Sequence, residues 1–307
     1  MNNQTLSTQS LSKWRYAGFK VAIVLMTVAL LVLITNGLNL GIDFTGGMIT
    51  RFATSETLTV QQMHDLLDPI MQGAFNLGSA NNGSEWMIQQ PATLATQHYK
   101  EWLDALAQSA HFEVNFMDSN FIGPQVGDEL IDQGGLAMLA SLVAIMLYLA
   151  ARFEWRLAVG SIIALFHDVL VVLGIFALFG LEFNLTVLAA LLAVIGYSLN
   201  DSIIVADRIR ELMRMNKNSP LDNIVNAAIA STMSRTLITS GTTLATVGSV
   251  WMLAGRPLEG FSVSLFVGIM VGTLSSICIS ATVPGLIGLD VDYYKRKIAQ
   301  RAEEMNS

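Results

Sequence analysis

Apolar stretches of close to 20 residues alternate with polar segments along the chain. They cover residues 17–35, 134–150, 157–179, 185–206, 234–254 and 261–282. A helix rises about 1.5 Å per residue, so each stretch is long enough to cross the roughly 30 Å hydrocarbon core of a membrane. The pattern predicts a helical polytopic membrane protein with six transmembrane helices: a first helix at 17–35, a polar domain, and a five-helix block over 134–285.

The polar segment over residues 36–133 has the shorter periods of a small folded domain. Alternation predicts strands at 48–52, 85–89 and 111–117, and amphipathic spacing predicts helices at 59–71 and 94–107. Thr59 is a suitable N-cap for the first helix, and Asn81-Asn82-Gly83 is a turn signal. With a short strand at 74–77, the order is β-α-β-β-α-β, which is the ferredoxin-like α+β arrangement.

Composition supports a membrane location. Only 13% of the residues are charged, against about 25% in soluble domains, and the mean hydropathy is +0.52. The first apolar stretch follows Lys13 and Arg15, as in a signal peptide, but it is longer than a typical signal core and no small-x-small cleavage site follows it. We therefore expect an uncleaved first transmembrane helix.

Charge is unevenly distributed and predicts the orientation. Residues 36–133 hold 12 Asp and Glu but only two basic residues, Arg51 and Lys100. Beside the predicted spans, 12 Lys and Arg lie on one side of the membrane and three on the other. The positive-inside rule then places the N-terminal residues 1–16, the loop 207–225 and the tail 286–307 in the cytoplasm, and the domain 36–133 in the periplasm. The amphipathic, basic stretch 207–226 is either a plain charged loop or a helix that lies against lipid headgroups or a partner.

Four ionisable residues lie well inside predicted spans: His167, Asp168, Asp201 and Arg235. A charge at mid-helix costs about 2.5–3.5 kcal/mol on insertion scales, so such residues are rare and tend to be functional. Asp201 and Arg235 have similar depths, which favours an ion pair facing the bundle interior. The pair is either a structural salt bridge or a proton-coupling site in which movement of Arg235 changes the proton occupancy of Asp201.

The adjacent residues His167 and Asp168 are further proton-coupling candidates. Their side chains point about 100° apart on a helix, so they cannot share one partner in the same geometry. One of them could simply hydrogen-bond to a neighbouring helix. Small residues near the charged positions, and the GxxxG pair Gly268 and Gly272, favour close helix packing.

Several chemistries have no signature in the sequence. We find no phosphate-binding loop, no His or Cys cluster with metal spacing and no nucleophile elbow. The single cysteine, Cys278, excludes an intrachain disulfide. We therefore expect neither an enzyme nor a cofactor, and the energy source that remains is an ion gradient.

Longer motifs resemble the SecD/SecF family of the resistance-nodulation-division superfamily. They are the segments 41–47 (Gly-Ile-Asp-Phe-Thr-Gly-Gly), 123–127, 152–156 followed by His167 and Asp168, 195–201 running into 207–211, and 234–243. They occur in the family order over about residues 40–285. The match is to the SecF side of the family, because SecD has a much larger first extracytoplasmic domain.

The resemblance implies a role in protein export at the bacterial inner membrane. Proteins of this kind pair with SecD, associate with the SecYEG channel and YajC, and use proton flow to draw a preprotein outward after the SecA motor has pushed it in. The implied partners are thus SecD, SecYEG, YajC, the preprotein and membrane lipid, and no nucleic acid. Two other classes stay open: half of a small-molecule/proton antiporter of the same superfamily, and a scaffold without a proton role.

The resemblance also carries site residues onto this sequence. The family's intramembrane Asp and Arg correspond to Asp201 and Arg235. Within the first motif, Asp43, Thr45, Gly46 and Gly47 either form a tight turn or transmit movement between the proton site and the periplasmic domain.

The predicted orientation can be tested with a reporter that is active only outside the cytoplasm. We expect activity from a fusion near Asn82, and none from fusions near Asn216 or after Met305. Activity at Asn216 would contradict the six-span topology.

Overall fold

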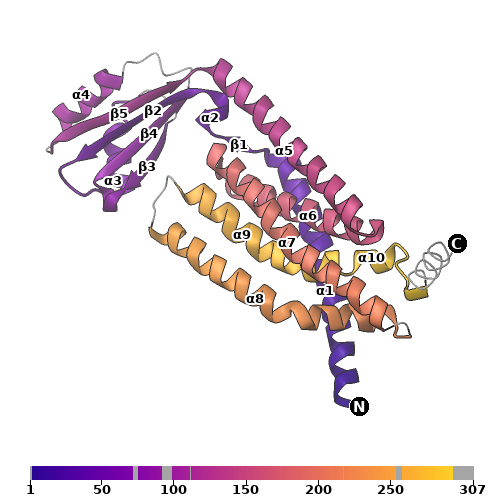
Figure 1. Cartoon of the computed structure of the whole chain (residues 1–307). Helices are drawn as coiled ribbons and strands as arrows, with labels where there is room; N and C mark the ends of the chain where they lie inside the picture. Colours follow the sequence, from indigo (N-terminus) through magenta and orange to yellow (C-terminus); the bar gives the residue numbers. More distant parts are fainter. Residues whose placement is uncertain are drawn as a thin grey trace.

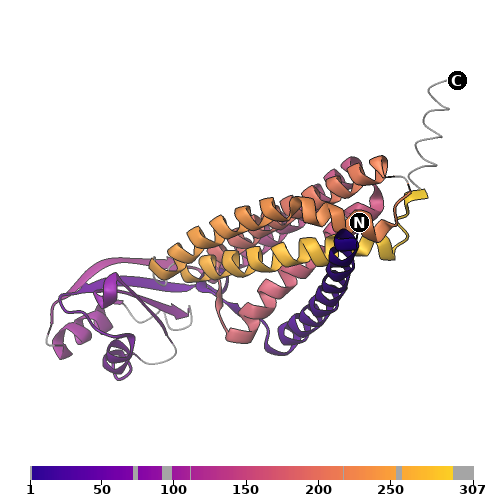
Figure 2. The same ribbon diagram turned by 90° about the horizontal axis from the view of Figure 1, so that it is seen from below.

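The computed structural model describes residues 2–71, 75–91, 99–110, 112–216, 218–253 and 258–292. A small domain built on a four-stranded sheet, here called the sheet domain (residues 47–122), lies at one end of an elongated helical bundle (Figure 1). The first helix begins, and the last described helix ends, at the opposite end of the bundle (Figure 2).

The sheet domain has the predicted order of elements. They are β2 (Gly47–Thr54), α3 (Val60–Leu67), β3 (Asn76–Ala80), β4 (Glu85–Pro91), α4 (Tyr99–Ser109) and β5 (Val114–Ile122). The strands pair antiparallel in the order β3-β4-β2-β5. This arrangement of a β-α-β-β-α-β chain confirms the ferredoxin-like prediction.

Apolar side chains between the sheet and its two helices form the core of this domain. Phe52 and Ile88 of the sheet, Met63 of α3 and Leu106 of α4 have no exposed surface. Thr59 caps α3 as predicted, in a reciprocal arrangement with Gln62 that satisfies two backbone donors.

Strand and helix boundaries differ from the prediction by several residues. The second strand was expected at 74–77 and lies at Asn76–Ala80, and the last strand runs to Ile122 rather than residue 117. The predicted second helix began at residue 94, but residues 92–98 lie outside the described part and α4 is seen from Tyr99. Propensity sets where an element forms more reliably than where it ends.

The bundle contains the long helices of the chain. They are α1 (Asn2–Asn36), α5 (Pro124–Arg152), α6 (Trp155–Phe179), α7 (Leu185–Met215), α8 (Leu221–Leu253) and α9 (Glu259–Ser275). A five-residue π-helical segment, η3 (Ser276–Ser280), follows α9 and leads to the short α10 (Val283–Leu286). Among the described residues, five helices are long and apolar enough to span a membrane: α1, α5, α6, α7 and the segment Glu259–Leu286.

Helix α8, which contains the predicted fifth span, is not among those five, so that span stays a prediction. The helix is rich in threonine, serine and glycine, which lowers its hydropathy. Its hydroxyl groups are nevertheless satisfied within the helix: Thr239, Thr242 and Thr243 each donate to the carbonyl four residues earlier, at 2.8–2.9 Å. Hydroxyls bonded in this way do not require water, and α8 packs beside α7 and α9 (Figure 1).

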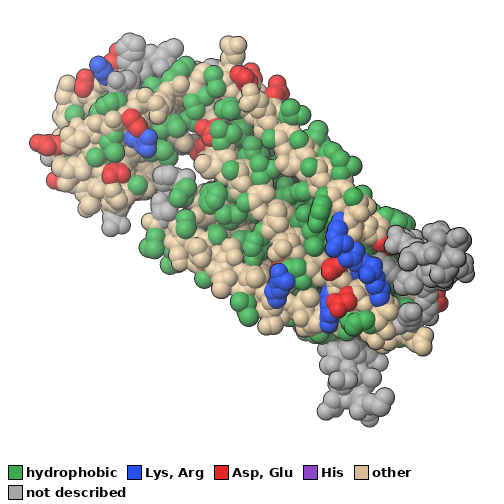
Figure 3. Space-filling model, in the orientation of Figure 1, with side chains coloured by type: hydrophobic (Ala, Val, Ile, Leu, Met, Phe, Trp, Pro, Cys, Tyr) green, Lys and Arg blue, Asp and Glu red, His purple; other side chains and the backbone are tan. Residues whose placement is uncertain are grey.

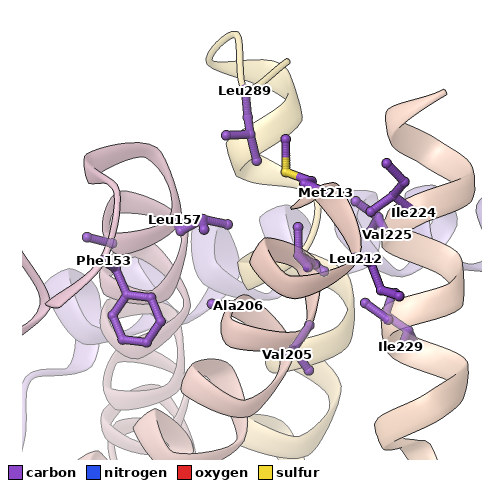
Figure 4. Close-up of a cluster of buried hydrophobic side chains, with 14 of the residues drawn as sticks. Phe153, Leu157, Val205, Ala206, Leu212, Met213, Ile224, Val225, Ile229 and Leu289 are labelled. Atoms are coloured by element: carbon purple, nitrogen blue, oxygen red, sulfur yellow. The ribbon is translucent and has the colours of Figure 1, made fainter. Parts of the chain in front are cut away.

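The cytoplasmic loop expected at 207–225 is mostly helical. Helix α7 continues to Met215, and α8 begins at Leu221. The ends of both helices are held by a cluster of buried apolar side chains that includes Phe153, Leu157 and Ile229 (Figure 4). Because these residues bury the apolar side of the stretch, its amphipathic pattern is explained by packing within the bundle.

The GxxxG pair brings α9 against α7. A Cβ atom added to Gly268 would lie 2.3 Å from Cγ2 of Val194, and one on Gly272 would lie 3.1 Å from Cβ of Ser198. Real Cβ atoms do not come as close as 2.3 Å and few come as close as 3.1 Å, so the helix contact requires glycine at 268 and favours it at 272. The predicted close packing at this pair is confirmed.

Gly268→Ala should therefore destabilise the bundle by about 1–3 kcal/mol, the usual cost of overpacking. The purified protein in detergent should show a lower Tm, and Val194→Ala in the same chain should restore it. Gly241→Ala is the matched control, because nothing lies within 4 Å of its added Cβ atom. An equal loss of Tm in both single variants would show that the α7–α9 contact is not the cause.

Candidate functional site

Asp168 lies near the middle of α6 and is fully buried. Its Oδ2 atom accepts hydrogen bonds from Oγ of Ser198 on α7, at 2.5 Å, and from Oγ of Ser275 on α9, at 2.8 Å. Its Oδ1 atom lies 2.9 Å from Nδ1 of His167. One carboxyl group thus joins three helices inside the bundle.

The hydrogen bonds of this cluster are compatible with both charge states of Asp168. A serine hydroxyl has one proton to donate, and an ionised carboxylate only accepts. The imidazole donates from Nδ1 to an ionised carboxylate, and in its other tautomer it accepts from a protonated Oδ1. Uptake of a proton removes the charge of the carboxyl group and so weakens the bonds from both hydroxyls. Ser275 has a second acceptor within reach, because the carbonyl of Gly272 lies 3.1 Å from its Oγ atom.

His167 completes the cluster and has one polar atom without a partner. Its side chain is 3% exposed, and among the described residues nothing hydrogen-bonds to its Nε2 atom. The sequence predicted that His167 and Asp168 would not share one partner in the same geometry. In the structure the two adjacent side chains hydrogen-bond to each other. The arrangement can hold, and reorganise around, a single proton.

The structure does not bring Asp201 and Arg235 into an ion pair. Asp201 on α7 is buried, and its Oδ2 atom has no partner among the described residues. Arg235 on α8 is exposed, and none of the ion pairs within 4.0 Å in the described chain joins the two. Asp201 instead lies one turn after Ser198 on the same helix, so both face the same side of α7.

The first motif fastens the sheet domain to α7. Oδ2 of Asp43 accepts a hydrogen bond from the backbone N–H of Leu185, the first residue of α7, at 3.0 Å. Oδ1 of Asn184 accepts from the N–H of Val187 at 3.1 Å. Both carboxylate and amide thereby satisfy donors that a helix leaves unpaired at its N-terminus.

Two short strands strengthen this connection. β1 (Asn39–Leu40) pairs in parallel with β6 (Glu182–Phe183) between α6 and α7, and the N–H of Gly41 donates to the carbonyl of Phe183 at 2.8 Å. The chain from α1 is thus held against the start of α7 before it enters the sheet domain.

The rest of the motif is a tight turn. Residues Ile42–Thr45 form the short helix α2, which ends at Gly46 with φ of 72°, a conformation that favours glycine. A Cβ atom on Gly47 would lie 2.4 Å from the carbonyl oxygen of Gln90. Thr45 is exposed and its hydroxyl donates to the carbonyl of Gly41 at 3.2 Å. The residues that form this tight turn therefore also include Asp43, which links the turn to the start of α7.

Two residues at these sites were missed by sequence reasoning. Ser275 gave no signal, because its contact with Asp168 joins positions 107 residues apart. Glu182 lies in a short connection and packs beside Gly41 and Asp43. Burial, together with the neighbouring carboxylate of Asp43, raises the pKa of Glu182. A charged residue in a five-residue connection between two predicted spans was the available clue.

Within the described ranges, no group of three or more His, Cys, Asp and Glu side chains is arranged to hold a metal ion. The candidate sites are therefore made of titratable and hydroxyl groups.

Comparisons with known proteins agree with this architecture. The family model for the C-terminal part of the protein export membrane proteins SecD and SecF matches residues 102–288, and the model for the SecD/SecF GG motif matches residues 31–56. The second match covers the turn that holds Asp43 at the start of α7.

Several SecF subunits are similar over nearly the whole chain. Protein translocase subunit SecF of Vibrio alginolyticus is 39% identical over 289 residues, which are 92% of this chain and 90% of that protein. SecF of Escherichia coli O157:H7 is 37% identical, covering 90% and 87%. SecF of Pseudomonas aeruginosa is 38% identical, covering 88% of each.

A solved structure is also similar. The crystal structure of SecDF, a translocon-associated membrane protein from Thermus thermophilus, matches with a TM-score of 0.74 and 32% identity. The match covers 92% of this chain but only 38% of that longer one. A family model that covers more than half of the chain, together with relatives above 30% identity over most of it, shows that the chain belongs to the SecD/SecF family of protein-export membrane proteins, as a protein translocase subunit of the SecF type.

Proposed function

We propose that this subunit, together with SecD, uses the proton gradient to promote protein export across the bacterial inner membrane, and that Asp168 is a proton-holding group of the coupling site. As a translocase subunit it is a transport component and not an enzyme. The observation that carries the proposal is the buried carboxyl group joined to α7 and α9 by two serine hydroxyls.

Protonation of Asp168 would change the contacts among three helices. An ionised carboxylate holds Ser198 and Ser275 by charge-assisted hydrogen bonds, which are roughly twice as strong as bonds to a neutral group. Once the carboxyl group is protonated, Ser275 can donate to Gly272 within its own helix instead. Loss of a proton reverses the change, so each proton that passes would loosen and then tighten the contact between α6 and α9.

Helix α7 is the element that would carry this change outward. It bears Ser198 in its middle and begins at the hydrogen bond with Asp43. The same motif leads directly into β2, the strand between β4 and β5 in the sheet. Movement of α7 along its axis would therefore pull on the sheet domain, which supports the transmission role of Asp43, Thr45, Gly46 and Gly47.

We include Asp201 and Arg235 in the proposed proton-coupling site, although the two are not paired in this structure. Because Asp201 has a buried oxygen without a partner among the described residues, it can take up a proton without breaking an existing bond. Arg235 is exposed on the neighbouring helix α8. We propose that the two approach each other in another state of the complex with SecD.

The distribution of charge supports the proposed orientation. In the view of Figure 3, Lys and Arg side chains gather at the end of the bundle farthest from the sheet domain, and Asp and Glu are frequent on the sheet domain. We propose that the basic end faces the cytoplasm, that the sheet domain is periplasmic, and that the subunit acts beside SecYEG and YajC.

Asp168→Asn tests the central proposal. Asparagine keeps the size and hydrogen-bonding capacity of the side chain but removes the titratable group, and serine hydroxyls can reverse to suit it. We expect normal abundance and SecD association, with export in membrane vesicles that no longer responds to the proton gradient. Asp207→Asn, at an exposed carboxylate of α7, is the control and should export normally.

If Asp168 has a purely structural role, Asp168→Asn should still export in response to the proton gradient. Asp168→Leu leaves several buried donors unsatisfied, at about 1–3 kcal/mol each, and should lower abundance under either view. Only the response of Asp168→Asn to the gradient separates them. Full gradient-dependent export by that variant would falsify the proposal.

The second pair of charges distinguishes a coupling role from a scaffold. Asp201→Asn should impair gradient-dependent export at normal protein level, because no ion pair holds Arg235 in the fold described here. Arg235→Lys, which keeps charge but loses the planar fork, should be partly defective, and Arg235→Leu more so. If the double variant Asp201→Asn with Arg235→Leu exports as well as the wild type, these charges have no coupling role and a scaffold explains them.

A further inference from the structure

A cleft of about 610 Å³ lies where the sheet domain meets the outer ends of the bundle helices. One wall is formed by β3, through Asn76, Leu77 and Gly78. The opposite wall comes from the α6–α7 connection and the start of α9, through Glu182 and Glu259. Asp43 of the proposed coupling motif and Leu77 of the sheet-domain core contribute to its lining.

Among the described residues β3 bonds to β4 alone, so the wall that it forms is an open edge of the described sheet. The phase of the ladder follows from the hydrogen bond between the N–H of Thr54 and the carbonyl of Ser84, at 2.8 Å. In antiparallel pairs, hydrogen-bonded and non-bonded positions alternate. The odd-numbered residues of β4 therefore direct their peptide groups toward β3.

The odd-numbered residues of β4 lie opposite Asn76, Gly78 and Ala80. The peptide groups of these three β3 residues therefore hydrogen-bond to β4. The peptide N–H and C=O groups of Leu77 and Ser79 point the other way, out of the sheet, and Leu77 lines the cleft. An edge of this kind is a template for a further strand.

Protein edges are usually protected by lysine, proline or a bulge. β3, with the sequence Asn-Leu-Gly-Ser-Ala, has none of these, and its register with β4 is regular. Leu77 and Gly78 are buried, whereas Asn76 is exposed and the small residues Ser79 and Ala80 are half-buried. The two ends of the edge are therefore the parts that an extended chain can reach.

The charge of the cleft indicates what kind of chain it suits. Asp43, Glu182 and Glu259 line it, and none of its described lining residues is Lys or Arg. Phe75 and Met87 add apolar surface to the lining. Peptide recognition by strand addition combines backbone bonds at an edge with side-chain pockets beside it.

We propose that this cleft binds an extended, positively charged segment of an exported polypeptide, which adds to β3 as a fifth strand. The inference rests on the proposed role in export, since that role supplies an unfolded chain on this side of the membrane. Backbone bonding is independent of sequence, so the site accepts many polypeptides, and the acidic wall favours segments with Lys or Arg.

The test is disulfide crosslinking in membrane vesicles that contain the complete translocase, with Cys278→Ser as background. Asn76→Cys places a thiol at the exposed start of β3, and Asn120→Cys, exposed on β5 at the other edge, is the matched control. The probe is a stalled export polypeptide with one cysteine in an extended lysine-rich segment. We expect several-fold more crosslinking at residue 76 than at residue 120, and several-fold less with a glutamate-rich segment. Equal yields at the two edges, or crosslinking of residue 76 to SecD or to a second copy of this subunit instead, would overturn the proposal.

A backbone variant tests strand addition directly. Ser79→Pro removes an outward N–H while leaving the ladder to β4 intact, and Ser79→Ala is its control. With Asn76→Cys present, the proline should reduce crosslinking about fivefold, the order expected for one lost hydrogen bond, and the alanine should not. No reduction by the proline would refute strand addition. These readouts do not depend on proton coupling: crosslinking that persists after the gradient is collapsed supports the cleft even if Asp168→Asn exports normally.

Discussion

The packing of α6, α7 and α9 depends on the hydrogen bonds that stabilise the buried carboxyl group of Asp168. An isolated ionised group inside the bundle would be strongly unfavourable, and Asp168 is stabilised only because α7 and α9 each supply a hydroxyl and α6 supplies an imidazole. The close approach of α9, which Gly268 and Gly272 permit, brings Ser275 within reach. The same group that makes the interior costly to assemble therefore specifies how three helices are placed.

Helix α7 connects the two parts of the molecule. Its first turn is capped by Asp43 and Asn184, its middle contacts Asp168, and its last turns are fixed in the apolar cluster at the far end. The sheet domain is tied to the polar end of this helix through the hydrogen bond of Asp43.

The sequence was sufficient for the class of fold and for the location of most elements. Hydropathy located five of the six predicted spans in helices that are long and apolar enough to cross a membrane, and strand and turn patterns predicted the ferredoxin-like order. The span in α8 and the orientation from the Lys and Arg counts stay predictions. The sequence could not give the rotation of one helix about its axis relative to another. Asp201 and Arg235 were predicted to pair, but Asp201 is buried and Arg235 is exposed on α8, and no ion pair joins them among the described residues. Ser275 was missed for the same reason, since a long-range contact leaves no local pattern.

The π-helical segment Ser276–Ser280 explains how one helix face serves two contacts. Ser275 bonds to Asp168, and Ser280 lies 3.4 Å from the hydroxyl of Ser161, seven residues earlier on the same α6. In a regular α-helix, positions five apart are about 140° apart around the axis. The wider π turn, with its longer hydrogen-bonded ring, brings them toward one side. Four positions apart in a regular α-helix, the two serines would lie about 40° apart and share one side. The π turn therefore accommodates one more residue between the two contacts without turning Ser280 away from Ser161.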